Sequence, residues 1–90
     1  MKSEDFYKLF SDEDYCNMDS NGDATFRGLV IISNYIDTSK NRIIQSGHDV
    51  VYSSDISELI EAGISEEDAN KLKEDNWFID SECDCMAHWV

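Results

Sequence analysis

The acidic side chains of this 90-residue chain are numerous and unevenly placed. Twenty residues are Asp or Glu and seven are Lys or Arg, which gives a formal charge of -13. Residues 1–23 hold seven acids and two bases, residues 24–54 hold two acids and three bases, and residues 55–84 hold eleven acids and two bases. Two acidic segments therefore flank a nearly neutral, apolar middle. A surface this acidic is repelled by nucleic acid and by anionic membranes, and it is attracted to basic protein surfaces.

The composition predicts one small domain over residues 1–90. Apolar residues make up 41% of the chain and aromatic residues 11%, which argues against disorder despite the high charge. Because no apolar run approaches 18 residues, we expect no membrane span, and the acidic N-terminus is unlike a signal peptide. Three Cys residues, an odd number, suit a reducing cytoplasm better than a disulfide framework. We therefore expect a cytoplasmic protein with ordinary thiols.

The first half of the chain predicts two helices. Ser3 is a suitable N-cap for a helix over residues 4–10, and Asp23 for a second helix over residues 24–36. The β-branched run within 29–32 leaves a strand as the alternative for the second segment. As a helix, it places four large apolar residues on one face: Phe26, Leu29, Ile32 and Ile36.

The second half predicts strands, turns and two more helices. Residues 42–46 and 49–53 form two short strands around a Gly-His turn, and residues 77–80 and 86–90 form a terminal hairpin. Between these hairpins we expect Asp55 to cap a helix over residues 56–62, which Gly63 ends. Ser65 to Asp68 then has the form of a capping box for a helix that runs to about residue 75. The expected fold class is α+β: a small antiparallel sheet of about four strands packed against two to four short helices.

Residues 17–23 resemble the first half of an EF-hand calcium loop. They place oxygen ligands at loop positions one, three and five and Gly at position six. Position twelve, where a bidentate Glu belongs, is occupied by Gly28. Because that loss removes two oxygen ligands, we expect an Asx-rich turn here, with a calcium-sensing module as an alternative.

Cys83, Cys85 and His88 are potential zinc ligands, and Cys16 is a possible fourth. On a strand, however, His88 stands at odd spacing from Cys85 and faces the other side of the sheet. We therefore expect a partly exposed hairpin turn and no bound metal.

His48 and Asp49 have the residue types of the metal-binding pair in HD phosphohydrolases, but the chain lacks the further His and Asp ligands that those enzymes need. No nucleophile elbow, phosphate-binding glycine loop or Cys-His-Asn set stands out. We expect no enzymatic activity and no cofactor.

Clustering makes the acidic residues a candidate partner-binding surface. Asp55, Glu58 and Glu61 recur at three-residue spacing on one helical side, and residues 67–75 extend a second side. Such neighbours lie roughly 5–6 Å apart, which is close to the spacing of successive phosphates on a nucleic acid strand. The expected partner-binding residues are Asp12, Glu13, Asp14, Tyr15, Asp55, Glu58, Glu61, Glu66, Glu67, Asp68, Glu74, Asp75 and Trp77. The alternative is a charged surface that serves only solubility.

The segment from residue 26 to residue 90 resembles short accessory proteins of phages and mobile elements. The residues that carry this resemblance are Gly28–Ile32 with Tyr35, His48–Tyr52, Ile64–Asp68, Trp77–Asp80 and His88–Val90. In size, acidity and lack of motifs the chain is similar to anti-CRISPR and anti-restriction proteins that act as DNA mimics. This likeness assigns no residue roles.

The resemblance implies a phage-encoded inhibitor that binds a basic, nucleic-acid-binding surface of a bacterial defence protein, such as a CRISPR effector. It would not bind nucleic acid itself. Two alternatives stay open: a metal-binding structural or sensor module that uses residues 17–23, and a small adaptor that binds a protein through a sheet edge without charge mimicry.

Overall fold

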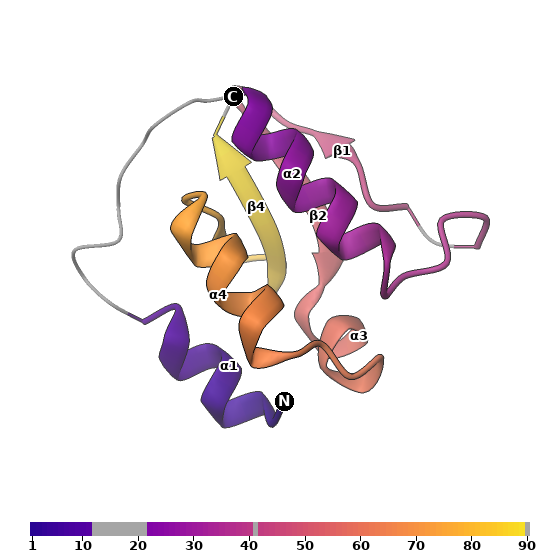
Figure 1. Ribbon diagram of the computed structural model, residues 1–90. Helices are drawn as coiled ribbons and strands as arrows, with labels where there is room; N and C mark the ends of the chain where they lie inside the picture. Colours follow the sequence, from indigo (N-terminus) through magenta and orange to yellow (C-terminus); the bar gives the residue numbers. More distant parts are fainter. Residues whose placement is uncertain (12–21, 41, 90) are drawn as a thin grey trace.

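A computed structural model describes residues 1–11, 22–40 and 42–89 of the chain (Figure 1). It confirms the α+β class, with four helices and a four-stranded antiparallel sheet in this described part. The elements in chain order are α1 (Ser3–Leu9), α2 (Gly22–Ser33), β1 (Gln45–Ser46), β2 (Val50–Asp55), α3 (Ile56–Glu61), α4 (Glu66–Glu74), β3 (Phe78–Asp80) and β4 (Cys85–Trp89).

The sheet has the strand order β1-β2-β4-β3, so the C-terminal strand β4 lies inside it. The register pairs Val51 with His88 and Ile79 with Met86. Side chains alternate between the two faces of a strand. Met86 packs into the helical core and His88 contacts residues of α2 and α4, so these two side chains define the face that the helices cover.

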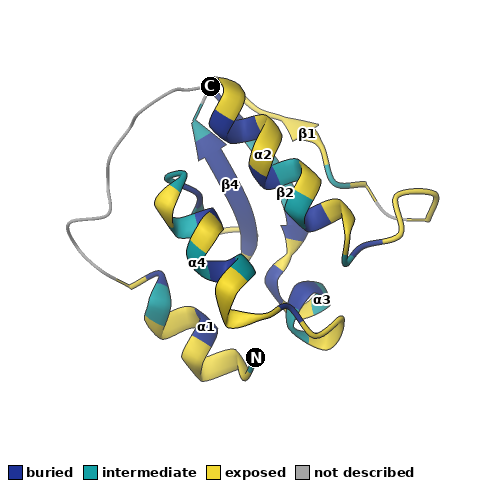
Figure 2. Cartoon of the chain, in the orientation of Figure 1, coloured by how far each residue is buried: buried dark blue, intermediate teal, exposed yellow. Residues whose placement is uncertain are grey.

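The core lies between this face of the sheet and the four helices (Figure 2). Each helix contributes at least one fully buried apolar side chain, because each is amphipathic and must cover its apolar face. The fully buried side chains from the helices, the α4–β3 connection and β4 include Phe6, Ile32, Ile56, Leu59, Leu72, Trp77 and Met86.

The second predicted helix is confirmed as α2, and Ile32 and Ile36 of its predicted apolar face are buried in the core, but the placement of Phe26 on that face is wrong. Phe26 is 67% exposed, and Leu29 is only partly buried. The face that packs inward instead carries smaller residues, namely Ala24, Thr25, Gly28 and Ile32. A Cβ atom on Gly28 would lie 1.9 Å from Nε1 of Trp77. The indole of Trp77 therefore occupies the space that a side chain at position 28 would need, and this contact sets the rotation of α2.

Several helix boundaries differ from the expected caps. Ser3 is the first residue of α1, and the N-cap is Lys2, which makes no side-chain cap bond. Asp23 lies within the first turn of α2. Asp55 is the N-cap of α3, but its side chain accepts no cap hydrogen bond. The helix dipole favours an acidic residue near a helix start even where its side chain makes no cap hydrogen bond. The residue type alone therefore did not show whether an acidic residue is the N-cap or lies in the first turn.

Other boundary predictions are confirmed. Ser65 caps α4, and its Oγ accepts a hydrogen bond from the Asp68 amide at 3.1 Å. Gly63 has a φ angle of +85°, which suits a glycine that ends a helix. In the first hairpin β1 is shorter than predicted, and Asp49 belongs to the turn at a φ of 63° rather than opening β2.

The terminal hairpin is confirmed as β3 and β4, joined by the turn that contains Cys83. The expectation of free thiols in this turn is wrong, because Cys83 and Cys85 form a disulfide. Odd Cys counts do not exclude one local bridge within a turn. Cys16 lies outside the described residues.

Candidate functional site

Three acidic side chains on and beside α3 form an open negative surface. Asp55 and Glu61 are exposed, and Glu58 is partly exposed. Their spacing is three residues, which places them on one side of the helix. No salt bridge to a described residue involves any of the three. This α3 acidic surface, defined as Asp55, Glu58 and Glu61, thus carries three uncompensated charges.

The acidic residues of α4 are more engaged within the molecule. Nζ of Lys71 lies 3.6 Å from Oε1 of Glu67, and the Tyr35 hydroxyl donates to Asp68 at 2.5 Å. Asp75 accepts two hydrogen bonds from the guanidinium of Arg27, at 2.8 and 3.1 Å. These contacts with Asp75 raise the pKa of Arg27. Glu66 and Glu74 remain exposed on this helix.

The structure removes Trp77 from the predicted partner-binding residues. Its side chain is fully buried, and its indole N–H donates to the Ala24 carbonyl at 3.2 Å. It lies under α2, so it is a core residue and makes no surface anchor. Of the remaining predicted residues, Asp12, Glu13, Asp14 and Tyr15 lie outside the described residues, as does the calcium-like segment up to Asn21.

A buried polar cluster around His88 was not foreseen from the sequence. His88 is 1% exposed, with Nδ1 2.7 Å from Oγ1 of Thr25 and 2.8 Å from the carbonyl oxygen of Trp89. Its Nε2 lies 2.8 Å from the carbonyl oxygen of Asp75, and its ring centroid lies 5.1 Å from that of Trp77. Both ring nitrogens are thereby used to join α2, the end of α4 and β4. A buried, fully engaged imidazole of this kind stabilises the fold.

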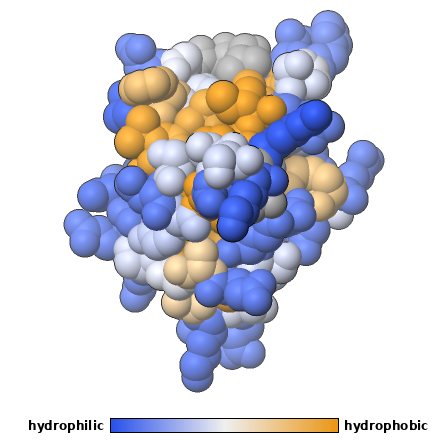
Figure 3. Space-filling view, turned by 90° about the vertical axis from the view of Figure 1, so that its right-hand side faces the viewer, coloured by the Kyte–Doolittle hydropathy of each residue, from blue (hydrophilic) through white to orange (hydrophobic). Residues whose placement is uncertain are grey.

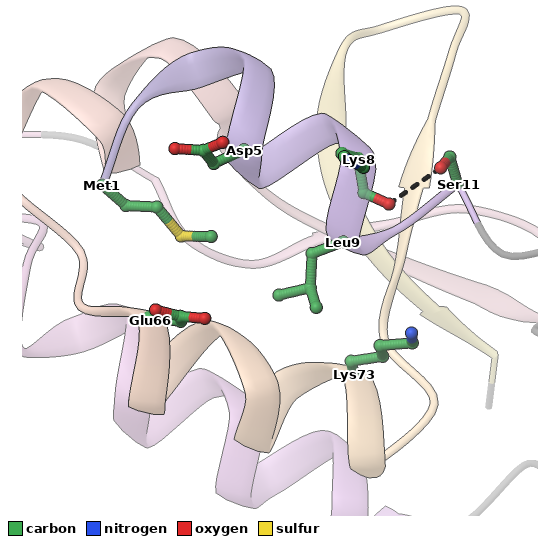
Figure 4. A pocket seen from close by; sticks show the side chains of 7 residues that line it. All are labelled: Met1, Asp5, Lys8, Leu9, Ser11, Glu66 and Lys73. Carbon is green, nitrogen blue, oxygen red and sulfur yellow. Dashed lines mark hydrogen bonds between the residues drawn. The ribbon is translucent and has the colours of Figure 1, made fainter.

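A hollow with a volume of about 900 Å³ lies between α1 and α4 (Figure 4). In the close-up, Leu9 of α1 extends toward α4, and Glu66 and Lys73 stand on the α4 side. Two acids (Asp5 and Glu66) and two lysines (Lys8 and Lys73) line it with Met1, Leu9 and Ser11. Among the described lining residues these opposite charges balance, so they give the hollow no net charge by which to select a partner.

A smaller hollow of about 280 Å³ lies beside α3, and all the charged side chains in its described lining are acidic. Its described lining holds Asp37, Glu58 and Glu61, with Tyr35, Ile36 and Ala62, and includes neither Lys nor Arg. Hydrogen bonds from the hydroxyl and amide of Ser39 lower the pKa of Asp37, so this carboxylate keeps its charge to lower pH. The α3 acidic surface thus borders a concave, negatively charged site.

Some large apolar side chains on α2 and just before β1, outside the α3 acidic surface, are also exposed. Val30 is 45% exposed and lies one turn from Phe26 on α2, and Ile44 is 60% exposed just before β1. Figure 3 shows apolar residues gathered in the upper part of one face, with hydrophilic residues around and below them.

Metal-ligating residues do not converge in the described ranges. No group of three or more His, Cys, Asp or Glu residues there could hold a metal ion. Cys85 and His88 occupy opposite faces of β4, as the strand spacing predicted. His48 and Asp49 approach to 3.5 Å, but both side chains are well exposed in a turn.

Comparison of the chain with protein-family models, with curated proteins and with solved structures finds no match. Among the described residues, no helix is both long enough and apolar enough to cross a membrane.

Proposed function

We propose that this protein is a phage-encoded inhibitor that binds a basic, nucleic-acid-binding surface of a bacterial defence protein, in the cytoplasm of the host cell. The α3 acidic surface contacts Lys and Arg side chains of that partner and so occupies the place of nucleic acid phosphates. The defence role of the partner rests on the resemblance in size and charge to DNA-mimic inhibitors. The basic character of its surface rests on the structure's charge distribution.

The observation that carries the proposal is the contrast between α3 and α4. Both helices are acidic, but the carboxylates of Glu67 and Asp75 already have basic partners within the chain. The α3 acidic surface has none among the described residues and adjoins a hollow lined only by acidic and uncharged side chains. Its charges are therefore available to a partner at no cost of breaking internal ion pairs.

The proposal is tested with a matched pair of triple variants. Asp55→Asn, Glu58→Gln and Glu61→Gln together remove three charges from α3. Glu66→Gln, Glu67→Gln and Glu74→Gln remove three from α4 and serve as the control. The partner is first identified by pull-down from bacterial lysate with mass spectrometry, and its affinity for each purified variant is then measured.

We expect the α3 variant to bind roughly tenfold more weakly or worse, because each lost contact with a basic side chain contributes up to about 1 kcal/mol. The α4 variant is expected to lose much less. Both variants should keep the melting temperature of the parent, since the substituted side chains are on the surface. A folded α3 variant that binds with full affinity refutes the proposal.

A further inference from the structure

A third hollow lies at the start of α3, on the sheet rather than among the helices. It has a volume of about 300 Å³. All of its described lining residues come from the four strands and the β3–β4 turn: Gln45, Tyr52, Ser53, Asp55, Asp80, Glu82, Cys83 and Cys85. Cys85 and Asp80 stand on the face of the sheet opposite Met86 and His88, since residues alternate along a strand. This sheet-face hollow is therefore separate from the 280 Å³ acidic hollow beside α3.

The register explains why carboxylates converge there. Asp55 of β2 and Asp80 of β3 both pair with Cys85 of β4, one from each side. Directly opposed residues share a face, and neighbouring strands are about 4.8 Å apart, so the two Cα atoms are about 10 Å apart across Cys85. The disulfide to Cys83 covers the sulfur between them. Glu82 adds a third carboxylate from the turn, and the described lining contains no Lys or Arg.

Two further features of the lining suit a planar cation. Tyr52 supplies an aromatic ring, whose face attracts a cation. Oγ of Ser53 exposes less than 1 Å² and has no hydrogen-bond partner in the described part of the chain. A buried hydroxyl that lacks a partner is costly, and a ligand that supplies a donor relieves that cost.

We propose that the sheet-face hollow receives an arginine side chain of the protein partner. The guanidinium donates to Asp55 and Asp80 on its two edges and packs its plane along the Tyr52 ring. A lysine ammonium is a point charge with no plane to stack, and it does not span two separated carboxylates as the guanidinium fork does. This inference rests on the proposed function, to which it adds the residue that the partner inserts and the place where it binds.

The test titrates N-acetyl-arginine amide, and in parallel N-acetyl-lysine amide, into the full-length protein and follows backbone amide shifts by NMR. We expect saturable shifts concentrated at Tyr52, Asp55, Asp80 and Cys85, with arginine binding more tightly than lysine. Asp80→Asn combined with Glu82→Gln should weaken arginine binding by about fivefold or more. Asn at position 80 can still accept the hydrogen bond that Asp80 takes from the Glu82 amide.

The matched control is Glu66→Gln combined with Glu74→Gln, which removes the same charge from α4 and should leave arginine binding unchanged. Shifts spread evenly over all acidic elements, equal binding of lysine and arginine, or no loss in the Asp80 and Glu82 variant would each overturn the inference. Glu58→Gln combined with Glu61→Gln, which leaves Asp55 and the sheet-face hollow intact, separates this result from the proposed function, because it tests partner binding through the α3 acidic surface alone. If that variant loses the partner while arginine fails to bind here, the sheet-face inference alone is refuted.

Discussion

Replacing Gly28 by Ala tests the packing of α2 against Trp77. The added Cβ would lie 1.9 Å from Nε1, 2.1 Å from Cε2 and 2.6 Å from Cζ2 of the indole. Ordinary van der Waals contact begins near 3.4 Å, so the helix and the ring must separate by about 1.5 Å. Because Trp77 is fully buried among core residues, the ring has no free space into which to move.

The expected cost follows from three terms. Overpacking a core costs about 1–3 kcal/mol, and disturbing the hydrogen bond from Trp77 to the Ala24 carbonyl costs about 1 kcal/mol more. Alanine offsets about 1 kcal/mol of this through its higher helix propensity. The free energy of unfolding should therefore fall by about 1–3 kcal/mol, or roughly 4–8 °C in Tm for each kcal/mol in a domain of this size.

The assay is urea unfolding followed by tryptophan fluorescence and far-ultraviolet circular dichroism. Gly22→Ala is the matched control, because a Cβ there meets no atom within 4 Å and the residue also belongs to α2. This control should be neutral or slightly stabilising. A Gly28→Ala protein as stable as Gly22→Ala would refute the account of how α2 packs.

Two other predictions concern local contacts. The hydrogen bond from the Tyr7 hydroxyl to Asp84, at 2.6 Å, raises the pKa of Tyr7 to about 12. A raised pKa stabilises the fold below the unfolded value of 10 and loses that contribution as pH rises toward 12, so Tyr7→Phe should flatten the loss of stability between pH 10 and 12. Ultraviolet titration of tyrosinate should show that Tyr7→Phe removes a group that titrates near pH 12, and a variant that keeps this step would contradict the assignment. Ser65→Ala should lower the free energy of unfolding by about 1 kcal/mol through loss of the α4 cap, whereas exposed Ser57→Ala in α3 should change it little; equal effects on thermal melts would rule out the capping role.

Local signals in the sequence were enough for much of the fold. The serine cap of α4, the glycine that ends α3 and the terminal hairpin each depend on a few neighbouring residues, and each is found in the structure. The place of Phe26 on α2 was misjudged because the rotation of this helix is set by Trp77, 49 positions from Gly28 in the chain. Hydrophobic size favoured Phe26 as a core residue, but the close approach of an indole requires a glycine instead.

The candidate site was predictable to a similar extent. The three-residue spacing of Asp55, Glu58 and Glu61 follows from the sequence and the helix period, and the structure places Glu58 and Glu61 on α3 and Asp55 at its N-cap. The sequence did not show which acidic side chains form ion pairs within the chain, because Arg27 and Asp75, which do so, are 48 positions apart. The convergence of Asp55 and Asp80 on Cys85 likewise depends on strand order, which the sequence pattern did not specify.

The salt dependence of partner binding, measured with and without nucleic acid, tests the central claim most directly. Attraction between the acidic surface and a basic partner acts over a Debye length of about 10 Å at 0.1 M salt, so affinity should fall steeply as salt rises. The partner's nucleic acid substrate should also displace the protein in proportion to its own affinity. An affinity that stays constant from low to high salt, in a complex that holds the protein and nucleic acid together, would contradict the account.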